Sequence, residues 1–547
     1  DIKLKLAFPV LDGFIIGDNL DENKYFHGLN GGSMGGFPID FKAMYGYSLP
    51  VMDVYNEKSN TGIYLRINDT SNTHKVLDLV KRTTENENLK RFHDVAGSSK
   101  GHTDVLKNVG MGMAVQYLEQ TLSPNESLST SPTVIAIHQG DWRECMKAYR
   151  GWVMTWYKKQ APRPLWFRKV FVHKALHQQH YHPEDKYIRD WIQRGDDMVD
   201  INHWMVSRGD YHVRDDWGGA ELLKEEICYW RDQGIHTSLY LESVCVGRQT
   251  ELGKAHGQDW SVLQDGQRAT SEADLEWNFC AGSIGWQDYL AKTCARLVKE
   301  TDCDSLYPDS VGLRYYLCED PKHDHPVGSG WYGSVERLLQ KLRKAVKPET
   351  ILYLEYISTD VNTQYLDGCY SPCVNAGMEM RKNGFPLYVT GTNLFRFYFP
   401  DFKFIEIMPE TEEGIGLSFF NGNGIHGYLN NPDVRPYIEK LSFIYREYSD
   451  AFTSELLTAY YPTLKKGVFS NAFTGDGRVV YTIYNSNDEQ IEGNMIQVPY
   501  AKGTNIAELI RDREAKAFVS GNIATLSFRI EPREVLCIVV DYKGAVP

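Results

Sequence analysis

One repeated pattern governs residues 166–429: a short apolar run, a polar loop and then, in several repeats, an amphipathic helix. Amphipathic helices are predicted at 219–233, 286–300 and 331–346, and a last one at 434–449. Strands are predicted at 169–176, 198–206, 235–244, 304–310, 351–357, 365–371, 403–408 and 424–429. Eight strands alternating with helices are typical of a parallel α/β barrel of the TIM type, (β/α)8.

Alternating strands flank this region on both sides. Before it, runs such as VMDVYN and TVIAIHQGD are separated by polar turns, and an aromatic helix is predicted at 141–157. Pro162 and Pro164 end that helix. After the barrel, GRVVYTIYN, IATLSFRI and EVLCIVVDY alternate again. We therefore predict an N-terminal β-sandwich with a linker helix (1–162), a (β/α)8 barrel (163–452) and a C-terminal antiparallel β-sandwich (453–547).

The charge balance narrows the classes of partner. Lys and Arg number 59 and Asp and Glu 72 in 547 residues, which leaves a net charge of −13. Nucleic acids and anionic membranes are disfavoured, because binding phosphates relies on clustered Lys and Arg. No apolar run approaches the roughly 18–20 residues of a membrane span. The first residues lack a signal-peptide pattern, yet we expect a periplasmic or secreted location rather than a cytoplasmic one. The sequence leaves the oligomeric state open.

The ten cysteines show no spacing typical of a zinc ribbon. Several of them, such as Cys228 and Cys537, lie within apolar patterns. We therefore expect buried free thiols rather than a disulfide framework.

Barrel enzymes place their catalytic groups at the C-terminal ends of the strands. The polar residues at the predicted ends are His173, His177, His203, Trp204, Glu242, Asp309, Glu355, Asp367, Glu406 and His426. Asp309 and Glu355 each end an apolar run on consecutive strands. Two carboxyl groups across one cleft suit glycoside hydrolysis, with a separation of about 5–5.5 Å for retention or about 6.5–9.5 Å for inversion. The competing interpretation is that each carboxylate pairs with an Arg or caps a loop.

Other residues near the predicted mouth are candidates for binding a sugar. Aromatic planes such as Trp204 and Trp331 stack on sugar rings, and Arg314 could orient a carboxylate. The remaining candidates are His173, His177, His203, Glu242, His323, His325 and His426. We favour sugar contacts over a metal site for these histidines, because their spacing along the chain matches no typical set of metal ligands. The sequence predicts no cofactor and leaves a bound calcium open.

Two segments carry a family resemblance. Residues 209–242 and 283–330 resemble a bacterial group of glycoside-hydrolase-like (β/α)8 barrels, many of unassigned function. The motif residues are Tyr307, Asp309, Cys318, Asp320, His323, His325, Pro326 and Glu355. The N-terminal region resembles the tail of the mutarotase-like sandwich that precedes these barrels. The sequence leaves open whether residues upstream of Asp1 complete it.

The placement of Asp309 on strand 4 and Glu355 on strand 5 is also similar to retaining α-glycosidases of the α-amylase type and to endo-α-N-acetylgalactosaminidases. The resemblance implies that Asp309 is the nucleophile and Glu355 the acid/base of a double displacement on α-linked glycans. It implies a carbohydrate as the partner. Two alternatives remain: a carbohydrate-binding barrel without catalysis, and a histidine-rich metal-dependent hydrolase.

Overall fold

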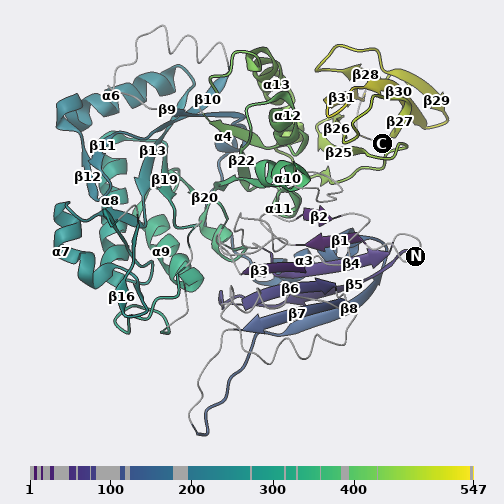
Figure 1. Cartoon of the computed structure of the whole chain (residues 1–547). Coiled ribbons are helices and arrows are strands. Elements are labelled where there is room, and N and C mark those ends of the chain that lie inside the picture. The colour runs from purple at the N-terminus through teal and green to yellow at the C-terminus, as the bar shows by residue number, and fades with distance from the viewer. Residues whose placement is uncertain are drawn as a thin grey trace.

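A closed barrel of eight parallel strands forms the centre of the molecule, as the computed structural model shows (Figure 1). The structure describes residues 5–8, 14–16, 25–29, 49–56, 59–73, 75–81, 111–117, 124–176, 195–271, 274–312, 314, 316–327, 331–357, 359–382, 393–427, 429–542 and 546. The barrel strands are β9 (Val172–Leu176), β10 (Asp196–Ile201), β13 (His236–Glu242), β19 (Ser305–Asp309), β20 (Ile351–Glu355), β21 (Gly368–Ser371), β22 (Lys403–Ile407) and β23 (Gly424–Gly427). Each overlaps one of the eight predicted strands, so the barrel prediction is confirmed.

Helices cover the outside of the barrel. Four of them lie where helices are predicted, namely α6 (Gly219–Asp232), α8 (Ile284–Thr301), α9 (Trp331–Ala345) and α13 (Arg435–Glu447). The sequence did not predict α10 (Cys373–Lys382), α11 (Leu394–Tyr398) and α12 (Glu412–Phe420). Helix α8 begins where the Ser283 hydroxyl accepts the backbone N–H of Trp286, an N-cap that satisfies a donor left free by the helix. It ends at Asp302, which adopts a left-handed conformation.

The segment that leads into β9 closes the N-terminal end of the barrel, where the strands begin. The short helix α4 (Leu165–Arg168) directly precedes β9, and its Trp166 ring stacks on His236 at the start of β13, with 3.7 Å between ring centroids. Phe167 is fully buried among Tyr307, Tyr353 and Tyr370 inside the barrel. A packed interior leaves only the C-terminal end of the strands for a functional site.

An additional unit projects from the C-terminal end after β13. The chain forms β14 (Cys245–Gly247), α7 (Glu251–Trp260), β15 (Leu263–Gln264), β16 (Gln267–Arg268), β17 (Thr270–Ser271) and β18 (Glu276–Asn278) before it enters α8. A hairpin, β11 (Met205–Ser207) with β12 (Asp210–Val213), follows β10 in the same way. These insertions lengthen the loops that frame the barrel mouth.

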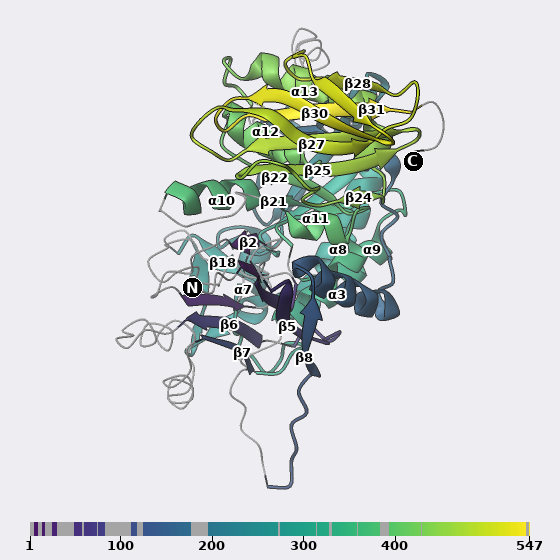
Figure 2. The same cartoon turned by 90° about the vertical axis from the view of Figure 1, so that its right-hand side faces the viewer.

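The described residues of the N-terminal domain form two antiparallel sheets. One has the order β2 (Phe14–Ile16), β1 (Lys5–Phe8), β4 (Val51–Asn56), β5 (Thr61–Ile67) and β8 (Thr133–Gln139). The other contains β3 (Tyr25–Leu29), β6 (Lys75–Lys81) and β7 (Met111–Tyr117). Helix α3 (Trp142–Trp156) connects this domain to the barrel and buries Trp142, Tyr149 and Val153 (Figure 2).

The N-terminal domain also contacts the loop that follows β20. The Asn72 side-chain amide donates to Asn362 at 3.1 Å, and its oxygen accepts the Thr359 hydroxyl at 2.7 Å. The Tyr149 hydroxyl on α3 donates to the buried carboxyl of Asp360, and burial raises the pKa of Asp360 to about 7. Buried polar contacts of this kind depend on good geometry, so they fix the domain against this loop.

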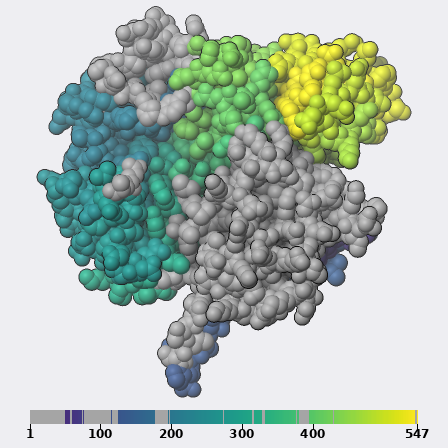
Figure 3. Space-filling view, viewed as in Figure 1, coloured from purple at the N-terminus to yellow at the C-terminus, as the bar shows by residue number. Residues whose placement is uncertain are grey.

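The C-terminal domain is a sandwich of two antiparallel sheets beside α12 and α13, drawn in yellow in Figure 3. Its larger sheet contains β24 (Leu457–Thr458), β25 (Val468–Gly475), β26 (Arg478–Asn485), β31 (Val535–Asp541) and β28 (Asn505–Glu508). The smaller sheet contains β27 (Ile491–Pro499), β30 (Ile523–Ile530) and β29 (Lys516–Ser520). In β31, Cys537 packs toward the barrel helices and Ile538 toward the sandwich core, which explains its continuous apolar sequence.

Helix α14 (Ser449–Phe452) lies between the barrel and this sandwich in the sequence. The described part of the chain contains no helix with the length and apolarity needed to cross a bilayer. All ten cysteines are free, and every one except the half-buried Cys228 is buried, as the sequence predicts.

Candidate active site

Three consecutive barrel strands end in the same way, with a tyrosine, one intervening residue and an acid. These endings are Tyr240 to Glu242 on β13, Tyr307 to Asp309 on β19 and Tyr353 to Glu355 on β20. Glu242 pairs with Asp309 in the sheet register, and the pairing of Ser305 with Ile351 places Glu355 at the same level. Residues two apart on a strand share a face, so a layer of tyrosines lies beneath a layer of carboxyl groups.

Asp309 and Glu355 meet directly. The Asp309 carboxylate acts directly on the carboxyl of Glu355, and both side chains are half-buried at the ends of their strands. Burial and the neighbouring Asp309 together raise the pKa of Glu355 to about 9. Two neighbouring carboxyl groups resist ionising together, and the raised pKa favours the protonated form of Glu355.

The backbone immediately after each of these carboxyl groups is strained. Ser310 and Tyr356 both adopt left-handed conformations, with φ of 67° and 60°. Non-glycine residues held there cost about 1–3 kcal/mol each and tend to cluster at functional sites. Gly312 lets the two strand ends approach, because a Cβ at that position would lie 2.4 Å from the backbone oxygen of Glu355.

Glu242 forms a third, fully buried carboxyl beside the pair. Its Oε1 accepts the backbone N–H groups of Val244 and Cys245 at 2.9 and 3.0 Å. Its Oε2 accepts the hydroxyls of Tyr240 at 3.1 Å and Ser310 at 3.2 Å. Burial and the neighbouring Asp309 raise the pKa of Glu242 to about 7. These four bonds hold the Glu242 carboxyl in one position beside Asp309.

Cations and a further acid complete the electrostatics of the site. Burial lowers the pKa of Arg314, but the nearby Tyr316, Glu242 and Glu355 favour the cation and raise this pKa above its ordinary value. Arg208 lies 3.8 Å from Glu242 and 3.2 Å from Glu276. Asp200, inside β10, is fully buried, and desolvation raises its pKa well above the usual range, with Asp309 adding to the effect. Sequence reasoning missed Asp200 as a member of this cluster, because it placed the end of this strand near 206, whereas β10 ends at Ile201.

The predicted histidines fall in different places. His173 on β9 is fully buried, and its Nδ1 lies 2.7 Å from the Tyr370 hydroxyl and 3.1 Å from Nδ1 of His426. Burial lowers the pKa of both rings, that of His426 to about 4, so both are neutral. His173 belongs to the barrel interior, whereas His426 is half-buried near the end of β23. His203 is exposed after β10, and His177 lies outside the described residues.

Two predicted stacking platforms are buried instead. Trp204 is fully buried, and its indole N–H donates to the backbone oxygen of Tyr240 at 2.6 Å. Trp331 is 2% exposed at the start of α9. Neither ring presents a face to a sugar, and this corrects the expectation for both. A large aromatic side chain contributes most to stability when buried, which explains their packing in the core.

Two predicted strand-end acids are structural. Asp367 precedes β21 instead of ending it, so it lies at the opposite end of the barrel from the mouth. It is paired there with Arg343 at 2.5 Å and accepts the backbone N–H of Leu352. Glu406 is fully buried on β22, where the side-chain amide of Asn423 donates to it at 2.8 Å.

His323 and His325 gather with two cysteines rather than with the carboxyl groups. One ligand atom from each of Cys280, Cys318, His323 and His325 lies within 4.8 Å of all the others. Of the described residues, these four are the set that could hold a metal ion. The spacing argument missed them, because Cys280 and Cys318 come from two different loops that only the folded barrel brings together.

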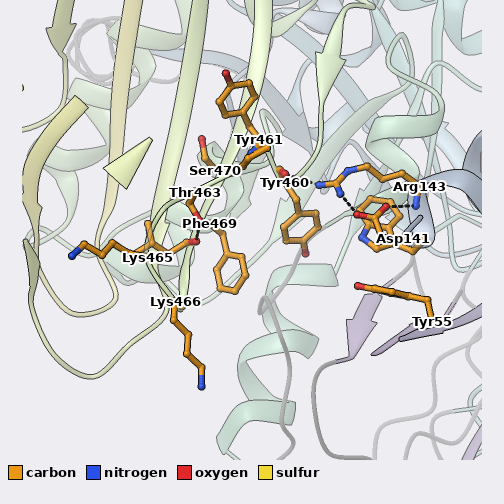
Figure 4. Close-up of a pocket in the computed structure, with 14 residues that line it drawn as sticks. Tyr55, Asp141, Arg143, Tyr460, Tyr461, Thr463, Lys465, Lys466, Phe469 and Ser470 are labelled. Atoms are coloured by element: carbon orange, nitrogen blue, oxygen red, sulfur yellow. Dashed lines mark hydrogen bonds and ion pairs between the residues drawn. The ribbon is translucent and has the colours of Figure 1, made fainter. Parts of the chain in front are cut away.

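A separate cavity of about 320 Å³ lies between the N-terminal domain, α3 and the C-terminal sandwich (Figure 4). Tyr55, Trp142, Arg143 and Tyr460 line it, and Arg143 donates to the backbone oxygen of Tyr460 at 2.5 Å. None of the predicted site residues lines this cavity.

Comparison with known proteins adds to the fold. Residues 128–388 match the model of a family described as a domain of unknown function (DUF6259). No curated protein matches the sequence significantly. Among solved structures, the chain is similar to the α-galactosidase from Lactobacillus brevis, at 11% identity and a TM-score of 0.60, over 99% of this chain and 73% of that one.

Other enzymes show the same arrangement. The GH36 α-galactosidase AgaA from Geobacillus stearothermophilus aligns at 10% identity and a TM-score of 0.59, over 99% of this chain and 75% of that one. The maltogenic α-amylase AmyB from Thermotoga neapolitana aligns at 13% identity and a TM-score of 0.50, over 68% and 98%. The chain has the fold of glycoside-hydrolase barrels. At such identities the likeness extends to the architecture alone.

Proposed function

We propose that this protein is a retaining glycoside hydrolase that acts on α-linked glycans. The observation that carries the proposal is the pair of interacting carboxyl groups of Asp309 and Glu355 at the C-terminal ends of neighbouring barrel strands. The solved relatives named α-galactosidase and α-amylase support an α-linked substrate. The raised pKa of Glu355 supports its role as the acid, because a general acid must hold its proton before the reaction.

The reaction proceeds in two displacements. In the first, Asp309 attacks the anomeric carbon while Glu355 gives its proton to the leaving glycosidic oxygen, so that a glycosyl–Asp309 ester forms and the aglycone departs. In the second, Glu355 takes a proton from water, and the oxygen of that water displaces Asp309. The sugar leaves with its anomeric configuration kept, and Glu355 is protonated again.

The surroundings fit this division of roles. The direct interaction of Asp309 with Glu355 supports the short separation of a nucleophile and its acid/base over the wider separation of an inverting pair. The Tyr307 hydroxyl donates to Asp309 at 2.7 Å and orients its carboxylate. Arg314 and the fixed Glu242 then set the charge balance around the reacting carbon.

The test is a panel of aryl α-glycosides and natural α-linked glycans, with the product anomer read by NMR. We expect Asp309→Asn to lose at least about 10³-fold in turnover, since the nucleophile is gone. Glu355→Gln should lose activity on poor leaving groups and keep much of it on activated aryl glycosides. Glu225→Gln, an exposed glutamate on α6, is the matched control.

Three results would contradict the proposal. Full activity of Asp309→Asn would exclude it as nucleophile, and an inverted product would exclude double displacement. Binding of glycans by the wild type without any cleavage would favour the non-catalytic carbohydrate-binding alternative.

A further inference from the structure

Four side chains at the barrel rim are arranged as metal ligands. Cys318 Sγ lies 3.3 Å from His323 Nδ1, and Cys280 Sγ lies 3.4 Å from His325 Nε2. Zinc bonds of about 2.3 Å to sulfur and about 2.0–2.1 Å to nitrogen place tetrahedral ligand atoms roughly 3.5 Å apart. The observed spacings therefore match the edges of a tetrahedron around such an ion.

The second nitrogen of each histidine is already bonded. His323 Nε2 lies 2.9 Å from the backbone oxygen of Asp259, and His325 Nδ1 lies 2.9 Å from that of Pro326. A carbonyl accepts a hydrogen bond only from a protonated nitrogen, so each ring turns its unprotonated nitrogen toward the cysteines. Zinc-binding histidines usually show this arrangement, because the outer hydrogen bond fixes the tautomer and the orientation of the ring.

Each sulfur atom of the cluster also accepts a hydrogen bond from the backbone. Cys318 Sγ accepts the backbone N–H of Leu263 at 3.4 Å, and Cys280 Sγ accepts that of Gly282 at 3.4 Å. Gly282 also makes room for the cluster, since a Cβ there would lie 2.3 Å from Cδ2 of His325. Backbone donors stabilise thiolate, the form of cysteine that binds metal.

The cluster is closed to substrate. Cys280 and Cys318 are each 1% exposed and His323 is 7% exposed, whereas His325 is half-buried. Four protein ligands leave no open position, and this distinguishes a structural zinc site from a catalytic one. Two thiolates balance the charge of a divalent ion, and a mixed sulfur and nitrogen set favours zinc over magnesium or calcium.

We propose that Cys280, Cys318, His323 and His325 bind one structural Zn²⁺ ion that joins two loops at the mouth of the barrel. Cys280 belongs to the insertion between β13 and α8, and the other three belong to the loop between β19 and α9. On binding, the two thiols release their protons to solvent and all four side chains become ligands. The ion holds together the loops that begin at Glu242 and Asp309.

The experiment measures metal directly and needs no substrate. The full chain is expressed with zinc in the medium and purified with a non-chelating phosphine reductant, and its metal content is read by mass spectrometry. We expect one zinc ion per chain. Cys318→Ser and His323→Asn should each reduce this at least tenfold. Cys228→Ser, a half-buried cysteine on α6, and His212→Asn, an exposed histidine, are controls that should keep it.

A second measurement covers variants that fail to fold. Cobalt supplied to wild-type apoprotein should produce the intense visible bands of a tetrahedral site with sulfur ligands, and zinc should abolish them. The proposal is overturned if wild-type protein neither retains zinc nor shows these bands, or if soluble cluster variants keep the metal. A Cys280–Cys318 disulfide in freshly purified protein would overturn it as well. None of these results depends on the proposed glycosidase activity.

Discussion

Replacing Glu355 with glutamine should stabilise the protein while removing its acid. In the unfolded chain this carboxyl ionises near its ordinary pKa of 4.5, whereas in the folded protein its pKa is about 9. Between these values the folded state binds a proton that the unfolded state has lost, so the free energy of unfolding falls as the pH rises. Glutamine is neutral at every pH and avoids this cost.

The size of the effect follows from the two pKa values. Each pH unit above 4.5 costs about 1.4 kcal/mol, so the wild type loses up to about 3 kcal/mol at pH 7 relative to a neutral side chain. Partial exposure of Glu355 reduces the figure to about 2–3 kcal/mol. For a barrel of this size we expect the melting temperature of Glu355→Gln to exceed that of wild type by about 4–8 °C at pH 7.

Thermal unfolding followed by circular dichroism from pH 4.5 to 9 measures this difference. The gain should be near zero at pH 4.5, grow as the pH rises and level off above pH 9. Glu225→Gln, on the exposed face of α6, should show no such trend. A Glu355→Gln variant that is no more stable than wild type at pH 8 would refute the assignment of the proton to Glu355.

Two further substitutions test other parts of the site. Gly312→Ala places a Cβ 2.4 Å from the backbone oxygen of Glu355, so we expect a loss of about 1–3 kcal/mol in unfolding free energy and up to about 10²-fold in kcat/KM. The control Gly151→Ala, on open helix surface, should leave kcat/KM unchanged, and equal behaviour of the two would reject the close approach. Asp367→Asn should cost about 3–5 kcal/mol in urea unfolding, because Arg343 loses its buried partner. Its kcat per folded molecule should stay at the wild-type value, and a selective fall in kcat would place Asp367 in the site after all.

The barrel could be predicted because its signals are local. Most strands contain an apolar run, as in ILYLE before Tyr356, and helices such as α8 show an amphipathic repeat that begins at a cap, here Ser283. Burial on both faces makes the strands apolar wherever they lie in the barrel. Asp309 and Glu355 could be selected from the sequence for the same reason, since each of them ends such an apolar run.

The predictions were wrong where the outcome depended on which end of a strand a residue occupies or on the partner of its side chain. Asp367 follows apolar residues in the sequence, yet β21 begins after it, so it lies at the end of the barrel opposite the mouth. Trp204 follows β10 as a surface aromatic would, but its indole donates to a backbone oxygen inside the core. A repeated signal went unused: SLYLE, SLYPD and ILYLE all end with a tyrosine two residues before an acid, and this points to Glu242 as a third member of the layer.

Periodicity and apolar runs were enough to predict the eight barrel strands, four of the helices around them, the flanking sandwiches and two acids worth testing. Closure of the barrel then decided which groups meet: it brought Asp309 against Glu355, raised the pKa of Glu355 and gathered Cys280 and Cys318 around two histidines. Hydrogen bonds and desolvation act over a few ångströms in space, and the spacing of residues along a chain carries no measure of that distance.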